Sequence, residues 1–163
     1  MTFSAEICAE LDSCDYLFLR EATELDYHGL HLVVEEGIPS LEAVSIKVGG
    51  TEITGGHRVE ATAESRLFDV VWQSYVAYSV RNESFVGRDE YEISVGRRLR
   101  IYSKSRFLDF IGSATFATDE YPGPLQHIGV YCENHIVDVV STKEPQVRLI
   151  RPTGPRASNL RPN

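Results

Sequence analysis

Hydrophobic and polar positions alternate along much of the chain, and the longest alternating run lies between Leu67 and Glu83. The side chains of one parity are apolar or aromatic: Phe68, Val70, Trp72, Val76, Tyr78 and Val80. The other parity carries mainly polar side chains: Asp69, Gln73, Ser79 and Arg81. A period of two built from β-branched and aromatic residues predicts a strand with one buried face. Because the run is longer than most strands, we expect a bend near Gln73–Ser74.

Shorter runs of the same kind predict further strands, bounded by Gly, Pro or acidic residues. They lie at 16–19, 30–34, 42–48, 90–95, 99–102 and 147–150. The segment 127–140 predicts a hairpin in which Tyr131 opposes Ile136. That register places one set of side chains on one face: His127, Gly129, Tyr131, Ile136, Asp138 and Val140. The opposite face then receives Ile128, Val130, Cys132, His135, Val137 and Val139.

The period changes to that of a helix from Ser105 onward, and Ser103 or Ser105 is available as the N-cap. Apolar side chains form one stripe there: Phe107, Leu108, Phe110, Ile111 and Ala114. A second, shorter helix is predicted from Ser4 to Ser13. The chain lacks the regular strand–helix–strand order of a doubly wound parallel sheet. We therefore expect an α+β fold: a mainly antiparallel curved β-sheet or incomplete barrel with one amphipathic helix, at about 105–117, packed on it.

The length of 163 residues suits one domain. We expect a β-rich domain over residues 1–150 and a tail over 151–163, where three Pro and three Arg occur without any acid. Three cysteines do not indicate a disulfide framework in a chain of this size. The first residues carry no cationic segment followed by an apolar run, and no apolar stretch is long enough to span a bilayer. These features favour a cytoplasmic location.

Negative charge is concentrated near the N-terminus of the chain. The net charge is −8, and residues 1–60 hold twelve acidic against three basic side chains. Such a balance argues against general binding to nucleic acid or to an anionic membrane. An acidic face that docks on a basic protein is expected from six residues: Glu21, Glu24, Asp26, Glu35, Glu36 and Glu42. The alternative is a solvated acidic surface that keeps the protein in solution.

A cluster of basic and hydroxyl residues leads into the predicted helix. Arg100, Ser103, Lys104, Ser105 and Arg106 are therefore candidates for binding an anion, because guanidinium groups and a helix N-terminus both attract negative charge. The alternative is that these bases pair with the acidic N-terminal third of the same chain.

Two pairs of side chains in the predicted hairpin have chemical potential. His127 and Asp138 lie diagonally on one face, as a general base and its orienting carboxylate or as a solvent-facing polar pair. Cys132 and His135 meet on the other face, where a reactive thiolate or two metal ligands would be possible. The chain has no further Cys or His spacing typical of a zinc site. We therefore expect a structural Cys132, no metal and no cofactor.

Two classes of function follow from these observations. The first is a non-catalytic acidic binding module, most concretely an immunity-type inhibitor that docks on a basic partner such as a toxin enzyme. The second is a small-ligand-binding or hydrolase-like β-fold with a pocket between sheet and helix. Its candidate lining residues are Trp72, Tyr75, Tyr78, His127, Tyr131 and Asp138. A homo-oligomer, with the tail as an arm, is a third interpretation. The chain shows no nucleophile elbow that would favour catalysis.

Overall fold

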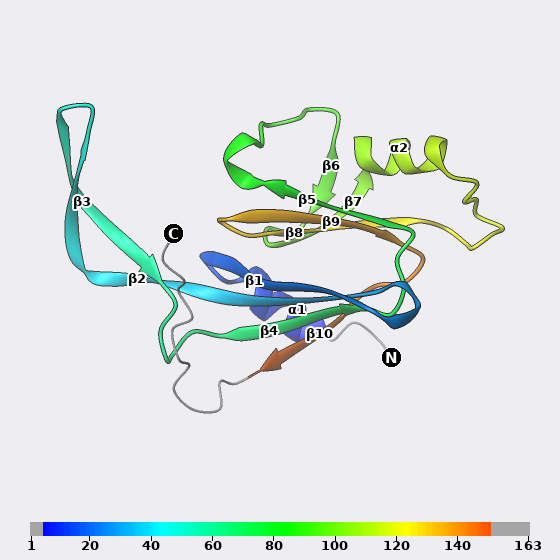
Figure 1. Ribbon diagram of the computed structural model, residues 1–163, viewed down its shortest axis with the longest axis horizontal. Coiled ribbons are helices and arrows are strands. Elements are labelled where there is room, and N and C mark those ends of the chain that lie inside the picture. Colours follow the sequence, from blue (N-terminus) through cyan, green and yellow to red (C-terminus); the bar gives the residue numbers. More distant parts are fainter. Residues whose placement is uncertain (1–4, 151–163) are drawn as a thin grey trace.

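A computed structural model describes residues 5–150, which form two five-stranded antiparallel sheets and two α-helices (Figure 1). The first sheet contains β1 (Tyr16–Leu25), β2 (Gly29–Val48), β3 (Thr51–Glu60), β4 (Leu67–Trp72) and β10 (Gln146–Ile150). The second contains β5 (Ala77–Asn82), β6 (Ile93–Val95), β7 (Leu99–Lys104), β8 (Gln126–Tyr131) and β9 (His135–Ser141). The helices are α1 (Ala5–Asp12) and α2 (Arg106–Ala114), and single 3-10 turns lie at Asp26–His28 and Glu83–Phe85. Residues 151–163, for which a tail is expected, lie outside the described residues.

The order of strands is β1-β2-β4-β10 in the first sheet, with β3 paired to the outer half of β2. In the second sheet the order is β5-β9-β8-β7-β6. The sheets pack face to face, and α2 lies over the outer face of the second sheet (Figure 1). The prediction of a mainly antiparallel α+β fold is thus confirmed. The strands form two sheets that do not close into a barrel, and the shorter helix predicted within 4–13 is present as α1.

The core lies between the two sheets. Strands β2 and β4 contribute Leu30, Leu32, Val34, Phe68, Val70 and Trp72, all almost fully buried. The second sheet contributes Leu99, Ile128, Val130, Val137 and Val139. Apolar surface removed from water stabilises the fold by roughly 25 cal/mol per Å². Side chains from only one face of each sheet enter this core, so the other face of the second sheet is available for different chemistry.

The single long strand predicted over 67–83 is wrong. Strand β4 ends at Trp72 in the first sheet, and β5 begins at Ala77 in the second. The break comes at the expected bend near Gln73–Ser74, but there the chain crosses between sheets. Phe68 and Tyr78 keep the same parity and both pack on the core between the sheets. Alternation therefore continues through the crossover, because both strands direct the same parity toward one core.

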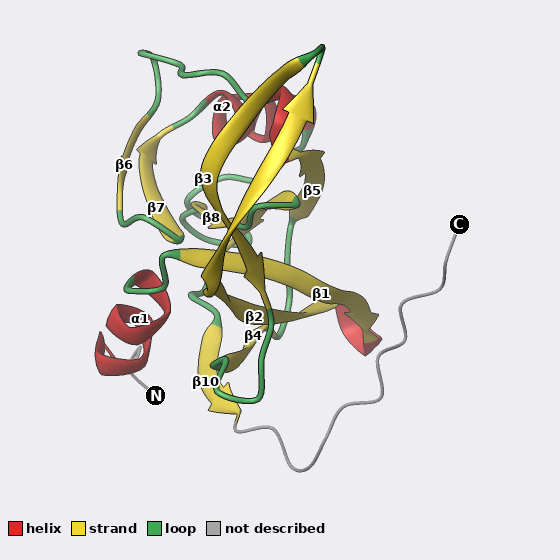
Figure 2. Cartoon of the chain, turned by 90° about the vertical axis from the view of Figure 1, so that its left-hand side faces the viewer, coloured by secondary structure: helices red, strands yellow, loops and turns green. Residues whose placement is uncertain are grey.

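Strands β2 and β3 extend beyond the body of the protein as a two-stranded ribbon (Figures 1 and 2). Its turn uses Gly49 and Gly50 with φ of 56° and 85°, a left-handed conformation in which glycine has no Cβ penalty. Leu41, Ile46 and Ile53 on this ribbon are more than half exposed. The ribbon is thus part of the first sheet at its base and solvent-exposed along its length.

The predicted register of the β8–β9 hairpin is confirmed, because Tyr131 pairs with Ile136 and Gly129 with Asp138. Helix α2 covers Arg106–Ala114 instead of the expected 105–117. Its N-cap is Ser105, whose hydroxyl oxygen accepts a hydrogen bond of 3.0 Å from the amide of Leu108. The helix ends at Thr115, whose amide donates to the carbonyl of Ile111.

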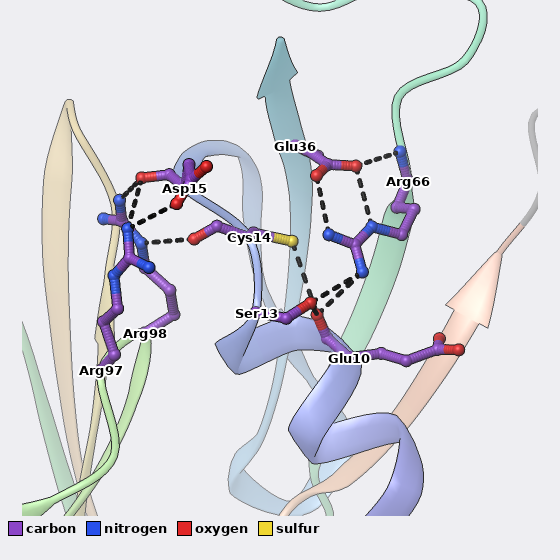
Figure 3. A network of polar contacts seen from close by, with 8 residues as sticks. All are labelled: Glu10, Ser13, Cys14, Asp15, Glu36, Arg66, Arg97 and Arg98. Atoms are coloured by element: carbon purple, nitrogen blue, oxygen red, sulfur yellow. Dashed lines mark hydrogen bonds and ion pairs between the residues drawn. The ribbon is translucent and has the colours of Figure 1, made fainter.

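A polar network joins α1 and the start of β1 to both sheets (Figure 3). Arg66 donates to both carboxylate oxygens of Glu36 at 2.8 and 2.7 Å, and to the Glu10 carbonyl and the Ser13 hydroxyl at 3.0 Å each. On the other side, Arg97 pairs with Asp15 at 3.1 Å, and Arg98 donates to the carbonyls of Cys14 and Asp15. These contacts fix the helix–strand junction at one end of the sandwich.

Candidate functional site

A pocket of about 470 Å³ opens on the outer face of the second sheet. Its walls come from β5, β7, β8 and β9, from α2, and from the segment 86–94 that follows β5. The volume lies within the range of small-molecule sites in proteins. The pocket therefore lies between sheet and helix, as the second functional interpretation expects.

The floor of the pocket contains a buried histidine and a buried aspartate. His127 is 1% exposed and Asp138 is 2% exposed. The Nε2 atom of His127 lies 3.0 Å from Oδ1 of Asp138, and Nδ1 lies 2.7 Å from the hydroxyl of Ser105. The second carboxylate oxygen of Asp138 accepts a hydrogen bond of 2.7 Å from Arg81. The solvent-facing alternative for His127 and Asp138 is thus wrong, because α2 and the pocket wall cover this face of the hairpin.

The order Ser105–His127–Asp138 resembles the hydrogen-bond order of a nucleophilic triad. Ser105, however, is fully buried, and its oxygen already caps α2. With Asp138 ionised, Nε2 of His127 is the donor to the carboxylate, and Nδ1 accepts the Ser105 hydroxyl proton. Both ring nitrogens are then used within the protein. This arrangement holds the carboxylate in place, and it leaves no nitrogen of His127 for a ligand.

Aromatic rings pack around this network. The ring of Tyr102 stacks on His127 with centroids 4.1 Å apart, and Phe107 meets the same imidazole edge-on at 5.5 Å. The hydroxyls of Tyr102 and Tyr131 are hydrogen-bonded at 2.5 Å. Burial, with this hydrogen bond, raises the pKa of Tyr102 well above its usual range. Tyr102 therefore stays protonated at neutral pH.

Four arginines line the pocket, but they differ in what they bind. Burial disfavours the charged form of Arg81, yet its hydrogen bond to Asp138 and the charge of that carboxylate outweigh burial and raise its pKa. Arg106 pairs with Asp89. The guanidinium of Arg100 lies over the Tyr131 ring, with Cζ 3.9 Å from the ring centroid. Within residues 5–150 neither Arg88 nor Arg100 pairs with a carboxylate.

The predicted anion-binding cluster is divided by the fold. Arg100 and Arg106 reach the pocket wall, whereas Ser105 is buried beneath α2. The exposed Ser103 hydroxyl donates to the carbonyl of Ile93 at 3.3 Å. The ammonium of Lys104 lies 3.9 Å from the centroid of the Tyr91 ring, outside the lining. Strand alternation explains the position of Ser103, which has the opposite parity from Arg100 and Tyr102 on the pocket side of β7. Ser105 and Arg106 belong to the start of α2.

Three of the six predicted pocket residues line the pocket, and the other three lie in or against the core between the two sheets. His127, Tyr131 and Asp138 line the pocket. Trp72 is instead 1% exposed in the core between the sheets, and Tyr75 and Tyr78 pack against that core. The hydroxyls of both tyrosines donate to Glu24, at 3.0 and 2.9 Å. Placing these three aromatic residues in the pocket is therefore wrong, because Trp72 belongs to β4 of the first sheet and both tyrosines pack against the core between the sheets.

The six residues of the expected acidic face also differ in their surroundings. Glu35 is 8% exposed and pairs with Arg20 at 2.5 Å. Glu36 pairs with Arg66 at 2.7 Å, and its pKa is lowered by the hydrogen bonds from that guanidinium. Glu21, Glu24 and Asp26 are exposed on the β1–β2 hairpin, and Glu42 is exposed on the projecting ribbon. Four of the six acids thus reach solvent, on two separate parts of the first sheet.

Cys132 lies in the core at 1% exposure, and burial raises the pKa of its thiol to about 12. The backbone amide of Cys132 donates to the carbonyl of His135, which closes the hairpin. Cys8, Cys14 and Cys132 are free thiols. Within the described part of the chain, no three His, Cys, Asp or Glu side chains are grouped as a metal site.

Arg88, Phe107 and Phe110 line the pocket, although sequence reasoning assigned none of them to it. Arg81, at the end of the alternating run, also lines it. The sequence held one signal for this wall of the pocket: Ser79 and Arg81 are polar residues on the same face of β5, alternating with apolar residues of the opposite face. Arg88 lies in a segment without periodicity, so no sequence pattern indicates where its side chain points.

None of the described helices combines the length and apolar character needed to cross a membrane. Comparison with known proteins found no family model, no curated protein and no solved structure that matches this chain.

Proposed function

We propose that this protein binds a small molecule in the pocket between the second sheet and α2. The observation that carries the proposal is a pocket of about 470 Å³ above a buried network in which Ser105, His127, Asp138 and Arg81 are joined by hydrogen bonds. A fully bonded polar floor is rigid, and a rigid site loses less entropy when a ligand binds. Arginines and aromatic rings on the walls supply polar anchors and apolar surface.

The proposed role is binding without catalysis. A general base needs a nitrogen or oxygen within hydrogen-bond reach of the substrate proton. Both nitrogens of His127 have protein partners, and Ser105 is buried beneath the helix that it caps. Asp138 in turn binds His127 and Arg81 with its two oxygens. These groups support a pocket wall of fixed shape and charge.

The test is to fill the pocket by mutation and to follow ligand binding by NMR. Ser94 lines the pocket, so Ser94→Trp places an indole in it, whereas Ser45→Trp adds the same ring to the exposed ribbon. Fragments added to the ¹⁵N-labelled full chain should shift amides of pocket residues in the wild type and in Ser45→Trp. They should not do so in Ser94→Trp. A fragment library that shifts no pocket amide in the wild type would refute the proposal.

A second candidate is the acidic binding module, most concretely an immunity-type inhibitor of a basic toxin enzyme. It is supported by the net charge of −8 and by the exposure of Glu21, Glu24 and Asp26 together on the β1–β2 hairpin. Such a cluster steers a cationic protein and speeds association at low salt. Either function fits a cytoplasmic protein, the location that we propose from three free thiols. A homo-oligomer also stays a proposal.

Salt-dependent association with basic proteins tests this second candidate. Glu21→Gln with Asp26→Asn removes two charges from the hairpin, and Glu52→Gln with Glu60→Gln removes two from the ribbon. The hairpin variant should associate more slowly with a captured basic partner, and the ribbon variant should behave as the wild type. Equal rates for the two variants would show that only overall charge matters.

A further inference from the structure

The distribution of arginines points to the charge of the ligand. The structure describes ten arginines, and seven of them pair with carboxylates. The three without such a partner in the described residues are Arg88, Arg100 and Arg148. Two of these three line the same pocket. In a chain with 24 acidic and 16 basic side chains, acids are in excess, so an arginine left without one is unexpected.

The acids in the pocket do not cancel this charge. Asp138 is bound by Arg81 and Asp89 by Arg106, so two of the three acidic lining residues are already neutralised. Glu92 is the third. Two unpaired guanidiniums against one remaining carboxylate give the lining a positive excess within a protein of net charge −8. The pocket is therefore an electropositive hollow on an acidic molecule, which attracts anions.

The geometry of Arg100 favours an oxyanion in particular. The Cζ atom of its guanidinium lies over the Tyr131 ring, 3.9 Å from the ring centroid. Tyr131 itself is held by Tyr102. The Nε–H of Arg100 donates to the carbonyl of Arg97 at 3.4 Å, which leaves the two terminal amino groups of the guanidinium for hydrogen bonds to an oxyanion. Phosphate and carboxylate groups match that spacing, whereas a halide ion or a neutral hydroxyl does not.

The apolar part of the lining indicates the rest of the ligand. Phe107 and Phe110 line the pocket from α2, and Phe110 remains 60% exposed. A large exposed aromatic side chain beside a hollow gains free energy when a flat apolar group covers it. An inorganic ion alone would leave the ring of Phe110 in contact with water.

We propose that the pocket binds a small organic oxyanion, a phosphate or carboxylate attached to a flat aromatic ring. Arg88 and Arg100 bind the oxyanion, and Phe110 packs against the ring. This inference rests on the proposed small-molecule function and specifies its ligand class. Phosphate and carboxylate share the recognition by guanidinium groups, so the experiment includes both.

The experiment measures dissociation constants by NMR titration of the full chain with four probes of similar shape: phenyl phosphate, benzoate, phenol and benzylamine. The two anions should bind in the pocket more tightly than phenol and benzylamine. The better of the two anions identifies the head group. Tighter binding of phenol or benzylamine in the pocket would overturn the charge assignment and leave the small-molecule function intact. Failure of all four probes to shift any pocket amide would overturn the ligand class, and the fragment library would still decide the small-molecule function separately.

Matched variants locate the interaction. Arg88→Gln and Arg100→Gln should each weaken binding of the better anion by roughly tenfold or more, the effect of losing a charge-assisted hydrogen bond. Arg148→Gln removes the same charge from an arginine outside the pocket and should leave affinity unchanged. Arg88 is exposed and has no partner in the described residues, so its removal should not affect folding. If all three variants weakened anion binding equally, only the overall charge of the protein would matter, and the assignment of Arg88 and Arg100 to the oxyanion would be overturned.

Phe110→Ala tests the aromatic part separately. Because the side chain is 60% exposed, the change removes little core packing. It should weaken phenyl phosphate severalfold and leave the weak binding of inorganic phosphate unchanged. An equal effect on both probes would show that the ring does not contact Phe110.

Discussion

The two faces of the second sheet come from the same strands and differ in almost every physical respect. The inner face presents Ile128, Val130, Val137 and Val139 to the first sheet, and all four are fully buried. The outer face presents alternate residues of the same two strands, among them His127 and Asp138, beneath α2 and the pocket. The inner face is buried by apolar packing, whereas His127 and Asp138 on the outer face are buried with their hydrogen bonds made within the protein.

This contrast shows how a short hairpin can build a core and a site at once. The inner face gains free energy for each apolar area buried, and small errors in shape are tolerated. The outer face gains little net free energy from each hydrogen bond, but a missing partner leaves a buried polar atom unsatisfied, which is costly. A substitution in the network of the outer face can therefore cost more free energy than the small net contribution of each hydrogen bond suggests.

The largest effect is expected on the inner face. Val137→Asp places a carboxylate in the core without a partner, which should cost several kcal/mol and prevent stable folding. Val80→Asp, on the strand paired with Val137, is the control, because Val80 is 46% exposed. Circular dichroism and urea unfolding would measure both. A folded, stable Val137→Asp variant would contradict the description of this face as a dry core.

On the outer face, Asp138→Ala should cost about 3–5 kcal/mol, because it leaves Arg81 and the buried His127 without their carboxylate partner. Asp138→Asn keeps an acceptor for His127 and should cost less. Urea unfolding at neutral pH gives both values. If Asp138→Ala lost less than about 1 kcal/mol, the network would not be part of the structural support of the pocket.

Ser105→Ala should be milder, at about 1–2 kcal/mol, since it removes the N-cap of α2 and the hydroxyl bonded to His127. Ser103→Ala, two residues earlier on the exposed side, should change the free energy of unfolding by less than about 0.5 kcal/mol. Thermal unfolding of the pair compares the buried capping hydroxyl with an exposed hydroxyl of β7. Equal losses in the two variants would argue that the hydroxyl of Ser105 has no special role.

The smallest effect concerns the ion pair of Glu36 and Arg66 at the end of the sandwich. Hydrogen bonds from Arg66 lower the pKa of Glu36 in the folded protein. The resulting stability is present above the ordinary pKa of 4.5 and is lost as pH falls through the lowered folded value. Partial exposure limits the contribution to about 1 kcal/mol. Glu36→Gln should therefore lower stability at pH 7 and not at pH 2, which urea unfolding at the two values would measure.

Particular residues show what could be predicted. The register of Tyr131 against Ile136 followed from the period of two, because a slip of one residue would have placed Val137 and Val139 on the polar face. Local chemistry predicted an N-cap at Ser103 or Ser105, and the structure uses Ser105. The crossover between Trp72 and Ala77 was not predicted. One long strand and two shorter strands in different sheets can show the same alternation of apolar and polar residues.

Local periodicity was sufficient to predict which residues of each strand share a face, where α2 begins, and that the protein is mainly antiparallel. Those properties depend on side-chain direction and capping, which act over a few neighbouring residues. The pocket required the folded chain, because Arg81, Arg100, Phe110 and Asp138 come from four elements that are distant in sequence. The pairing of Glu36 with Arg66 required it too. Contacts between distant segments depend on how the sheets stack, and alternation along one strand carries no information about which strand will face it.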